Sequence, residues 1–393
     1  MKLKRQPEDF QVEELPIACP RDRGRFGFYR LTKRGLGTFE AIEAICRRWN
    51  LPGRQVSYGG LKDRHAVTVQ YLTILDGPDR GLRETAFELE PIGRLDHPYG
   101  PDGFRGNRFV VTLRDLSRDA AERAATALGE VPRDGLPNYF DDQRFGSMGF
   151  EGGFIGHAWL LGNHEEAFRL AVAEPTPMDR PDARSEKTIL RDCWGDWASA
   201  KDRLPRSHSR SLVTYLVDHP TDFKGAFARI RRELRSLYFS AFQSHLWNLT
   251  LARFLEANTR DDQRVVHEFK TGPLPIHRHL DPDQAALLSS TSLPLPASRT
   301  TLPEEGPIRE TAIAVAASMG LAWEDLRVKG LKDVFFSKGN RPALFHPADP
   351  SHDLGRDDLY PGKSRVTLRF DLPKGAYATL VVKRITNDDS VDL

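Results

Sequence analysis

The chain has 393 residues, of which 39% are hydrophobic and 28% charged, and this balance excludes an intrinsically disordered protein. The formal net charge of +2 is too small to indicate nucleic-acid binding by itself. The three cysteines, Cys19, Cys46 and Cys193, lie far apart in the sequence, which excludes a disulfide framework and a thiolate metal cage.

The first third of the chain alternates short strand patterns with single helices. We predict strands over 9–15, 26–31, 55–58, 66–75 and 107–113, and helices over 38–49 and 118–128. Thr38 is a suitable N-cap for the first helix, and Gly129 is suited to end the second. This order of elements predicts an α+β domain with a mixed or antiparallel sheet.

The middle of the chain, from about 156 to 326, is typical of helices joined by proline-rich loops. Its four tryptophans and a helical run over 223–255 indicate a separate core; the tryptophans are Trp159, Trp194, Trp197 and Trp247. Strand patterns then return over 334–337, 343–346, 365–370 and 377–385, with Gly339-Asn340 suited to a hairpin turn. Because the chain is too long for one ordinary core, we predict a sheet domain split by a helical insertion. The predicted bounds are 1–158, 159–340 and 341–393.

Basic residues are concentrated in two segments. Residues 1–35 carry nine Lys/Arg against five acids, and residues 201–235 carry nine against four. Both segments are candidates to face phosphates, although a basic helix face is as often simply solvated. The N-terminal residues lack the apolar core of a signal peptide and no apolar run reaches the length of a membrane span, so we expect a cytoplasmic protein.

The segment 59–70 places one carboxylate between two cations in a glycine-rich turn between two predicted strands. We expect Lys62 and Arg64 to hold Asp63 ionised, as a carboxylate must be to attack an electrophile or accept a proton. The alternative is ordinary turn chemistry, because Gly-Gly followed by Asp is common in turns.

Two further segments combine aromatic, amide and basic side chains. In 136–146, Asn138 offers an amide suited to a base edge and Phe140 a face for stacking, although core packing is the commoner reason for such aromatic residues. The helix over 236–248 carries a polar stripe of Ser236, Ser240, Ser244 and Asn248, which needs partners. Phosphate-binding glycine loops, metal-ligand spacings and a Gly-x-Ser-x-Gly elbow are missing from the sequence, so we expect a reaction without cofactor or metal.

Four motifs together resemble the TruD family of tRNA pseudouridine synthases. They are KRQPEDFQVEE at 4–14, GLKDRHAVTVQ at 60–70, NYFDDQRFG at 138–146 and LPKGAYAT at 372–379, in family order. The resemblance implies a pseudouridine synthase catalytic domain with a mixed sheet, interrupted by the mainly helical TRUD insertion domain. It also implies an isomerase, with no cofactor, that converts uridine to pseudouridine in tRNA, with uridine 13 as the suggested site.

The resemblance assigns roles by position. Asp63 corresponds to the catalytic aspartate, and Phe10, Asn138 and Tyr377 to residues that contact the target uridine; Tyr377 stands where phenylalanine is frequent. Lys383 stands where an arginine is common and is a candidate partner of Asp63. Further candidate substrate-binding residues are Lys4, Lys62 and Phe140.

The expected partner is tRNA, with other structured RNA open, and we expect a monomer that binds neither membrane nor metal. Two other readings remain: a non-catalytic RNA-binding or chaperone protein on the same fold, and a hydrolase that uses Asp63 as base toward a small nucleotide. Whether Asp63 attacks C1′ of the ribose or removes a proton from C2′ to give a glycal stays open.

Overall fold

The computed structural model describes residues 1–149, 152–176 and 179–387, and the chain divides into two compact units. The sheet unit comprises Met1–Leu136 and the chain from Phe345 onward, and the insertion unit comprises Pro137–Leu344. The chain leaves the sheet unit within the short strand β8 (Leu136–Pro137) and returns within β13 (Leu344–Phe345). The first boundary therefore lies earlier than the predicted 158, because aromatic residues such as Phe145 and Phe154 are buried in the core of the insertion unit.

Among the described residues, nine strands form the sheet of the sheet unit, in the order β14-β15-β7-β1-β4-β2-β6-β5 with β3 paired to β4. Their bounds are β1 (Phe10–Pro16), β2 (Phe26–Arg34), β3 (Val56–Tyr58), β4 (Val67–Leu75), β5 (Leu82–Arg83), β6 (Phe87–Leu95), β7 (Phe104–Leu116), β14 (Ala348–Arg356) and β15 (Ser364–Pro373). The pair β1/β4 is parallel and the other pairs are antiparallel, so the predicted mixed sheet is confirmed. After the insertion the chain adds β15 beside β7 and completes the same sheet.

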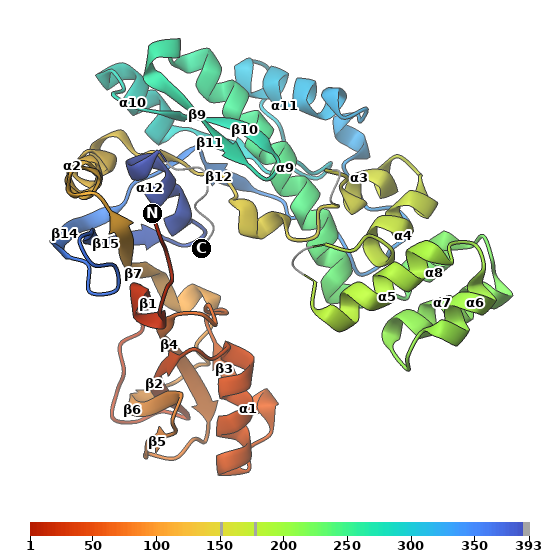
Figure 1. Ribbon diagram of the computed structural model, residues 1–393, viewed down its shortest axis with the longest axis horizontal. Coiled ribbons are helices and arrows are strands. Elements are labelled where there is room, and N and C mark those ends of the chain that lie inside the picture. The colour runs from red at the N-terminus through yellow and green to blue at the C-terminus, as the bar shows by residue number, and fades with distance from the viewer. Residues whose placement is uncertain (150–151, 177–178, 388–393) are drawn as a thin grey trace. The chain divides into compact units, whose positions relative to one another are not determined.

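Three helices cover this sheet (Figure 1): α1 (Thr38–Trp49), α2 (Arg118–Asp134) and α12 (Ala378–Thr386). The apolar side of α1 buries Ile42 and Ile45 against Leu72 and Ile74 of β4, as the helical spacing of its apolar residues predicts. Helix α2 packs against α12, β14 and β15. Short 3-10 turns η1 (Pro7–Asp9), η2 (Gly53–Gln55) and η3 (Pro101–Gly103) precede β1, β3 and β7.

The insertion unit is mainly helical, as predicted. Its helices are α3 (Ile155–Leu160), α4 (His164–Val172), α5 (Pro181–Asp192), α6 (Trp197–Arg203), α7 (His208–Asp218), α8 (Phe223–Ala228), α9 (Arg232–Asn258), α10 (Pro282–Ser290) and α11 (Pro307–Ser318), with 3-10 turns η4 (Asp142–Phe145), η5 (Asp261–Gln263) and η6 (Trp323–Asp325). Two small sheets pair β9 (Arg264–Phe269) with β10 (Gly272–His277), and β11 (Ser292–Pro294) with β12 (Asn340–Pro342). The long helix α9 contributes Phe239 to an aromatic cluster with Trp159 and Phe227.

Several element predictions were wrong. The segment 377–385, predicted as a strand from its apolar and β-branched run, instead contains the N-cap and most of α12, whose C-cap Asn387 has the left-handed conformation. Residues 334–337 form no strand, and the Gly339-Asn340 hairpin does not form because β12 pairs with the remote β11. Helix α2 continues past Gly129 to Asp134, since buried Leu128 and Val131 offset the poor helix propensity of glycine.

Strand β6 had no predicted counterpart, and the helical run over 223–255 is broken into α8 and α9. In the described part of the chain, no helix combines the length and the apolar character needed to cross a membrane.

Candidate active site

Asp63 lies on the loop that joins β3 to β4, the strand junction that the sequence predicts. Its carboxylate is 44% exposed, and the Lys4 ammonium lies 3.9 Å from its Oδ2. The same ammonium lies 4.2 Å from the centroid of the Phe10 ring. The parallel pairing of Gln11 with Val67 brings the start of β1 beside the end of this loop. Three candidate residues from two separate motifs therefore meet in the sheet unit.

The N-terminal segment that carries Lys4 is fixed by a buried ionic network. Lys4 has a φ of 45°, a left-handed conformation that residues other than glycine seldom adopt. The main-chain N–H groups of Arg5 and Gln6 donate to Asp9 Oδ2, at 3.0 and 3.2 Å. Asp9 Oδ1 in turn accepts from Arg114 Nε at 2.8 Å. The sequence analysis assigned Asp9 and Arg114 no role, since their pairing joins segments about a hundred residues apart.

Lys33 is the clearest functional candidate that the sequence analysis missed. Its side chain is buried, and Nζ donates to the carbonyl oxygens of Leu36 at 2.7 Å, Lys62 at 3.3 Å and Asp63 at 2.8 Å. Burial lowers the pKa of Lys33 to about 8, while the nearby charge of Asp63 acts in the opposite direction. A single ammonium thus holds the main chain on both sides of the Lys62–Asp63 peptide. In the sequence, Lys33 resembles an ordinary surface lysine of a strand. Its neighbouring residues give no sign that it is buried or that it binds a loop.

Thr38 and Gln70 fix the other end of the same loop. Thr38 Oγ1 accepts from the Lys62 N–H at 3.0 Å and donates to Gln70 Oε1 at 2.9 Å. Gln70 Nε2 donates to the Gly60 carbonyl at 3.3 Å. The prediction that Thr38 caps α1 was wrong, because the N-cap is Gly37 and the Thr38 hydroxyl accepts from the Lys62 N–H of the loop.

The two cations that flank Asp63 in sequence have other partners in the structure. Lys62 Nζ lies 2.7 Å from Oε1 of Glu14, and Arg64 Nη1 lies 3.0 Å from Oε1 of Glu40. The expectation that Lys62 and Arg64 hold the Asp63 carboxylate was wrong as to the residues. Lys4, in contrast, does lie beside that carboxylate.

The pair formed by Lys62 and Glu14 is buried beneath the loop. Glu14 is fully buried, and its Oε2 accepts from the Tyr71 N–H at 3.0 Å and from the Tyr99 hydroxyl at 3.2 Å. Burial, together with the charge of Glu14, raises the pKa of Tyr99, so that hydroxyl remains a donor. Lys62 therefore anchors the loop from below rather than presenting its charge to solvent.

The remaining candidates of the sheet unit lie on β1 and at α12. Phe10 is 3% exposed and packs on Phe109, with ring centroids 5.9 Å apart and Lys4 above it. Tyr377 is half-buried at the N-cap position of α12. Lys383 is fully buried on the same helix.

Asn138 and Phe140 belong to the insertion unit. The Asn138 side chain is held at both ends, because Oδ1 accepts from Arg341 Nη2 at 2.6 Å and Nδ2 donates to the Pro342 carbonyl at 3.1 Å. Arg341 also lies 4.2 Å from the centroid of the Phe140 ring, and Trp247 contacts that ring edge-on.

The polar stripe on α9 pairs with the segment 138–146. Asn248 accepts from the Phe140 N–H and donates to the Phe140 carbonyl, both at 2.8 Å. Ser244 Oγ accepts from Arg144 Nε at 3.2 Å. Two segments that the sequence analysis treated separately are therefore joined through Ser244 and Asn248 of the stripe, whereas Ser240 donates to the Leu237 carbonyl of its own helix.

The basic segment 201–235 is less free than its composition suggests. Arg235 is buried and forms a bidentate pair with Asp333 at 3.0 and 2.7 Å. Arg229 stacks on Tyr215, with its guanidinium 3.5 Å from the ring centroid. Part of this charge therefore stabilises the insertion unit itself.

Comparison with known proteins identifies the family. The family model for tRNA pseudouridine synthase D (TruD) matches residues 1–385. The chain belongs to the TruD family. Among its TruD relatives, a Methanocaldococcus jannaschii protein is 30% identical over 98% of this chain and 91% of its own length, and one from Leptospira interrogans, named tRNA pseudouridine synthase D, is 29% identical over 98% and 95%. The crystal structure of a Methanosarcina mazei protein described as TruD superposes with a TM-score of 0.76 at 26% identity, covering 99% of this chain and 94% of that one.

Membership in the TruD family implies an isomerase that acts on tRNA. It also accounts for the joint presence of the four motifs, which the fold distributes over both units. The fold matches as well, since the TruD structure covers both the split sheet unit and the insertion.

Proposed function

We propose that this TruD protein converts uridine 13 of tRNA to pseudouridine, with Asp63 as the catalytic carboxylate. The proposal is supported mainly by the contrast between the exposed carboxylate of Asp63 and the fixed main chain of its loop. The carboxylate of Asp63 is exposed, whereas the loop around it is fixed from three sides by Lys33, Thr38 and the pair of Lys62 with Glu14. An exposed acid on a rigid support is what a preoriented catalytic group requires.

The reaction is an internal transfer that is neutral in redox terms. The bond between ribose C1′ and uracil N1 breaks, the base turns, C5 bonds to C1′, and the proton on C5 is lost while N1 gains one. Asp63 acts either as a nucleophile at C1′ or as a base that removes the C2′ proton. The target uridine must first leave its stack, and aromatic side chains compensate for the stacking that it loses.

We assign Phe10 and Tyr377 to the stacking of the flipped base. Phe10 is now covered by Lys4, so binding requires the Lys4 ammonium to move from the ring toward the RNA phosphate or the Asp63 carboxylate. Lys383 and Lys62 are assigned to positioning from within the fold, as their burial favours.

We further assign Asn138 to the uracil edge and Phe140 to a supporting contact. The Asn138 amide uses one donor and one acceptor position on Pro342 and Arg341, which leaves one of each for a base. The fixed orientation of the amide favours selection of uracil over cytosine. We also propose a monomer that acts in the cytoplasm and accepts other structured RNA if it presents a similar uridine.

Release of tritium from tRNA that carries 5-tritiated uridine tests the proposal. We expect Asp63→Asn to lower the release rate at least about a thousandfold, because the reacting group is lost while the loop stays fixed. Asp22→Asn, the same change at an exposed acid of the sheet unit, is the control and should keep the native rate. Native-like release by Asp63→Asn would refute the catalytic role. No release from any RNA by the native chain would favour an RNA-binding protein without catalysis, and release from free uridine monophosphate would favour a small-nucleotide enzyme.

A further inference from the structure

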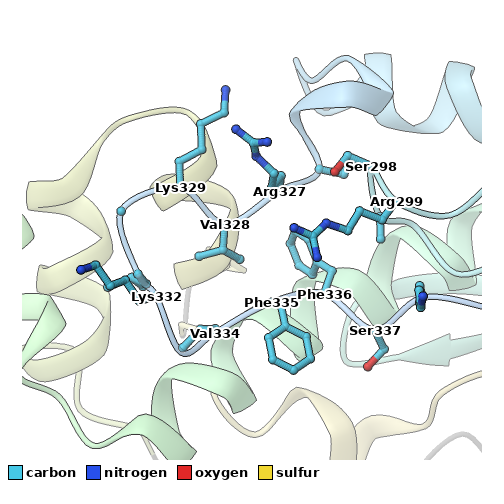
Figure 2. Close-up of a pocket in the computed structure, with 15 residues that line it drawn as sticks. Ser298, Arg299, Arg327, Val328, Lys329, Lys332, Val334, Phe335, Phe336 and Ser337 are labelled. Carbon is cyan, nitrogen blue, oxygen red and sulfur yellow. The ribbon is translucent and has the colours of Figure 1, made fainter.

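The insertion unit contains a cavity of about 610 Å³ whose rim is strongly basic (Figure 2). It is formed by the irregular segment 326–338 together with residues 297–299. Five cations line it and no acid does; they are Arg299, Arg327, Lys329, Lys332 and Lys338. Cavities of this size are large enough to take a nucleotide.

Most of these cations are free to bind a ligand. Within residues 1–149, 152–176 and 179–387, the side chains of Arg299, Arg327, Lys332 and Lys338 have no ion-pair or hydrogen-bond partner, and all four are exposed. Lys329 lies 3.6 Å from Asp325, but both side chains are more than half exposed, so the pair is weak. Figure 2 shows the segment doubling back on itself, with Arg299 extending into the space between its two limbs.

The one acidic residue of the segment 326–338, Asp333, is neutralised by an arginine that does not line the cavity. Asp333 follows Lys332 directly, and its carboxylate is bound by Arg235 at 3.0 and 2.7 Å. The arrangement therefore removes the negative charge that would oppose an anion, while Arg299, Arg327, Lys332 and Lys338 keep no acidic partner among the described residues.

The segment is irregular but firmly held. Trp159 Nε1 donates to the Lys329 carbonyl at 3.1 Å, and Gln243 Nε2 donates to the Ser337 carbonyl at 2.6 Å. At the tip, Gly330 has a φ of 85°, a left-handed conformation that favours glycine over residues with a side chain. A fixed loop of this kind loses little conformational freedom when a ligand binds.

An aromatic ring stands unburied beside the cations. Phe335 is 72% exposed, the most exposed large apolar side chain in the described part of the protein, whereas Phe336 next to it is 8% exposed. Leaving a phenylalanine ring in water has no structural benefit in the free protein. Unpaired cations around an aromatic face are the combination that binds single-stranded nucleic acid, with phosphates on the cations and a base on the ring.

We propose that the rim of this cavity is an RNA-binding site of the insertion unit, which takes an unpaired nucleotide of the tRNA substrate on Phe335 and its flanking phosphates on Arg299, Arg327 and Lys332. The site lies outside the group of residues around Asp63, and its role is affinity and choice of substrate rather than chemistry. This inference rests on the proposed function in one respect, which is that the ligand is tRNA.

Binding of a fluorescently labelled tRNA transcript, followed by anisotropy, tests this site. All variants are made on Asp63→Asn, so that binding is measured without turnover. We expect Arg327→Glu with Lys332→Glu to weaken binding at least about tenfold and to reduce the slope of log K against log salt concentration by about two, since two phosphate contacts are lost. Phe335→Ala should weaken binding about tenfold with little change in that slope, because stacking is not ionic.

The matched control is Arg253→Glu with Lys270→Glu, two exposed cations of the same unit outside the cavity lining. Control binding close to that of the parent supports the site, and an equal loss in the control and the cavity variant overturns it. A second result would also overturn it. If pyrophosphate raises the thermal stability of the native chain but not of the cavity variant, and both bind tRNA equally well, the cavity binds a small phosphorylated ligand instead. The two proposals can also fail separately. If the native chain releases no tritium while the cavity variants still bind tRNA more weakly than the control, the proposed function is refuted and this inference stands.

Discussion

At the scale of single residues, the structure separates charges that the sequence leaves equivalent. Lys62 and Arg64 both neighbour Asp63, yet one is buried on Glu14 and the other forms an exposed pair with Glu40. A buried charge that loses its partner is costly, whereas an exposed pair contributes little. Lys62 and Arg64 therefore have different roles.

Lys62→Ala should lower the free energy of unfolding by about 3 to 5 kcal/mol, because Glu14 would remain buried without its counter-ion. Arg64→Ala should cost less than about 1 kcal/mol, since its side chain and that of Glu40 are both largely exposed. Urea denaturation of the two variants measures the difference. Pairing Lys62→Met with Glu14→Gln should recover much of the loss, and equal destabilisation by the two alanine variants would contradict the assignment of a buried anchor.

Lys33 connects protonation to the shape of the loop. The protonated amine provides three donors for its three carbonyl acceptors, and the neutral amine provides two. Because burial lowers the pKa of Lys33 to about 8, the ammonium loses its proton as the pH rises through that value. We expect kcat to decline above pH 8.

The lowered pKa of Lys33 has the opposite effect on stability, because the free energy of unfolding should rise over the pH range in which kcat falls. The pKa of Lys33 is lower in the folded chain than the ordinary value of 10.5, so the cost of keeping it protonated is present below pH 8 and falls as the pH rises toward 10.5. Lys33→Met should lower kcat by about a hundredfold through loss of loop geometry, and should show neither pH dependence. Parallel pH profiles of kcat and of the free energy of unfolding, native against variant, measure both effects. Equal pH profiles for the native chain and Lys33→Met would contradict the role of Lys33.

At the scale of elements, the sequence predicted most of the sheet unit and missed what fixes its loop. Strands with clear alternation, such as β1, β2 and β4, were found, because a half-buried strand shows period two in its own residues. Helix α12 was missed, since its β-branched run resembles a strand and its helical form depends on packing against α2. The role of Thr38 depends on a loop more than twenty residues away, so local capping rules assigned it to the wrong partner.

Thr38→Val keeps the size of the side chain and removes both of its hydrogen bonds to the loop and Gln70. We expect the free energy of unfolding to fall by about 1 to 3 kcal/mol, because the Lys62 N–H loses its acceptor, and kcat to fall about tenfold. Ser117→Ala, which removes the N-cap of α2, should cost about 1 kcal/mol with kcat unchanged. The two values of kcat, compared at equal fractions folded, distinguish a loop contact from general stability. A kcat of Thr38→Val equal to that of the native chain would contradict the role of the Thr38 hydroxyl in positioning the Asp63 loop.

At the scale of the whole molecule, four motifs in family order predicted the fold class, the family and the residues around Asp63. The resemblance supplied Phe10, Tyr377 and Asp63 together, and the sheet unit contains all three. The supporting residues Lys33, Glu14 and Arg114 could not be predicted, because each acts through partners that only the folded sheet brings near. The basic cavity of the insertion unit was also missed, since segment 326–338 has no periodicity and its cations look like ordinary surface residues.

The central proposal is that this TruD protein isomerises uridine 13 of tRNA with Asp63 as the catalytic carboxylate. Mapping of pseudouridine at single-nucleotide resolution, in an unmodified tRNA transcript incubated with the native chain or with Asp63→Asn, tests it most directly. We expect pseudouridine at position 13 with the native chain and none with Asp63→Asn. Pseudouridine at position 13 made by Asp63→Asn, or native modification confined to another position, would contradict it.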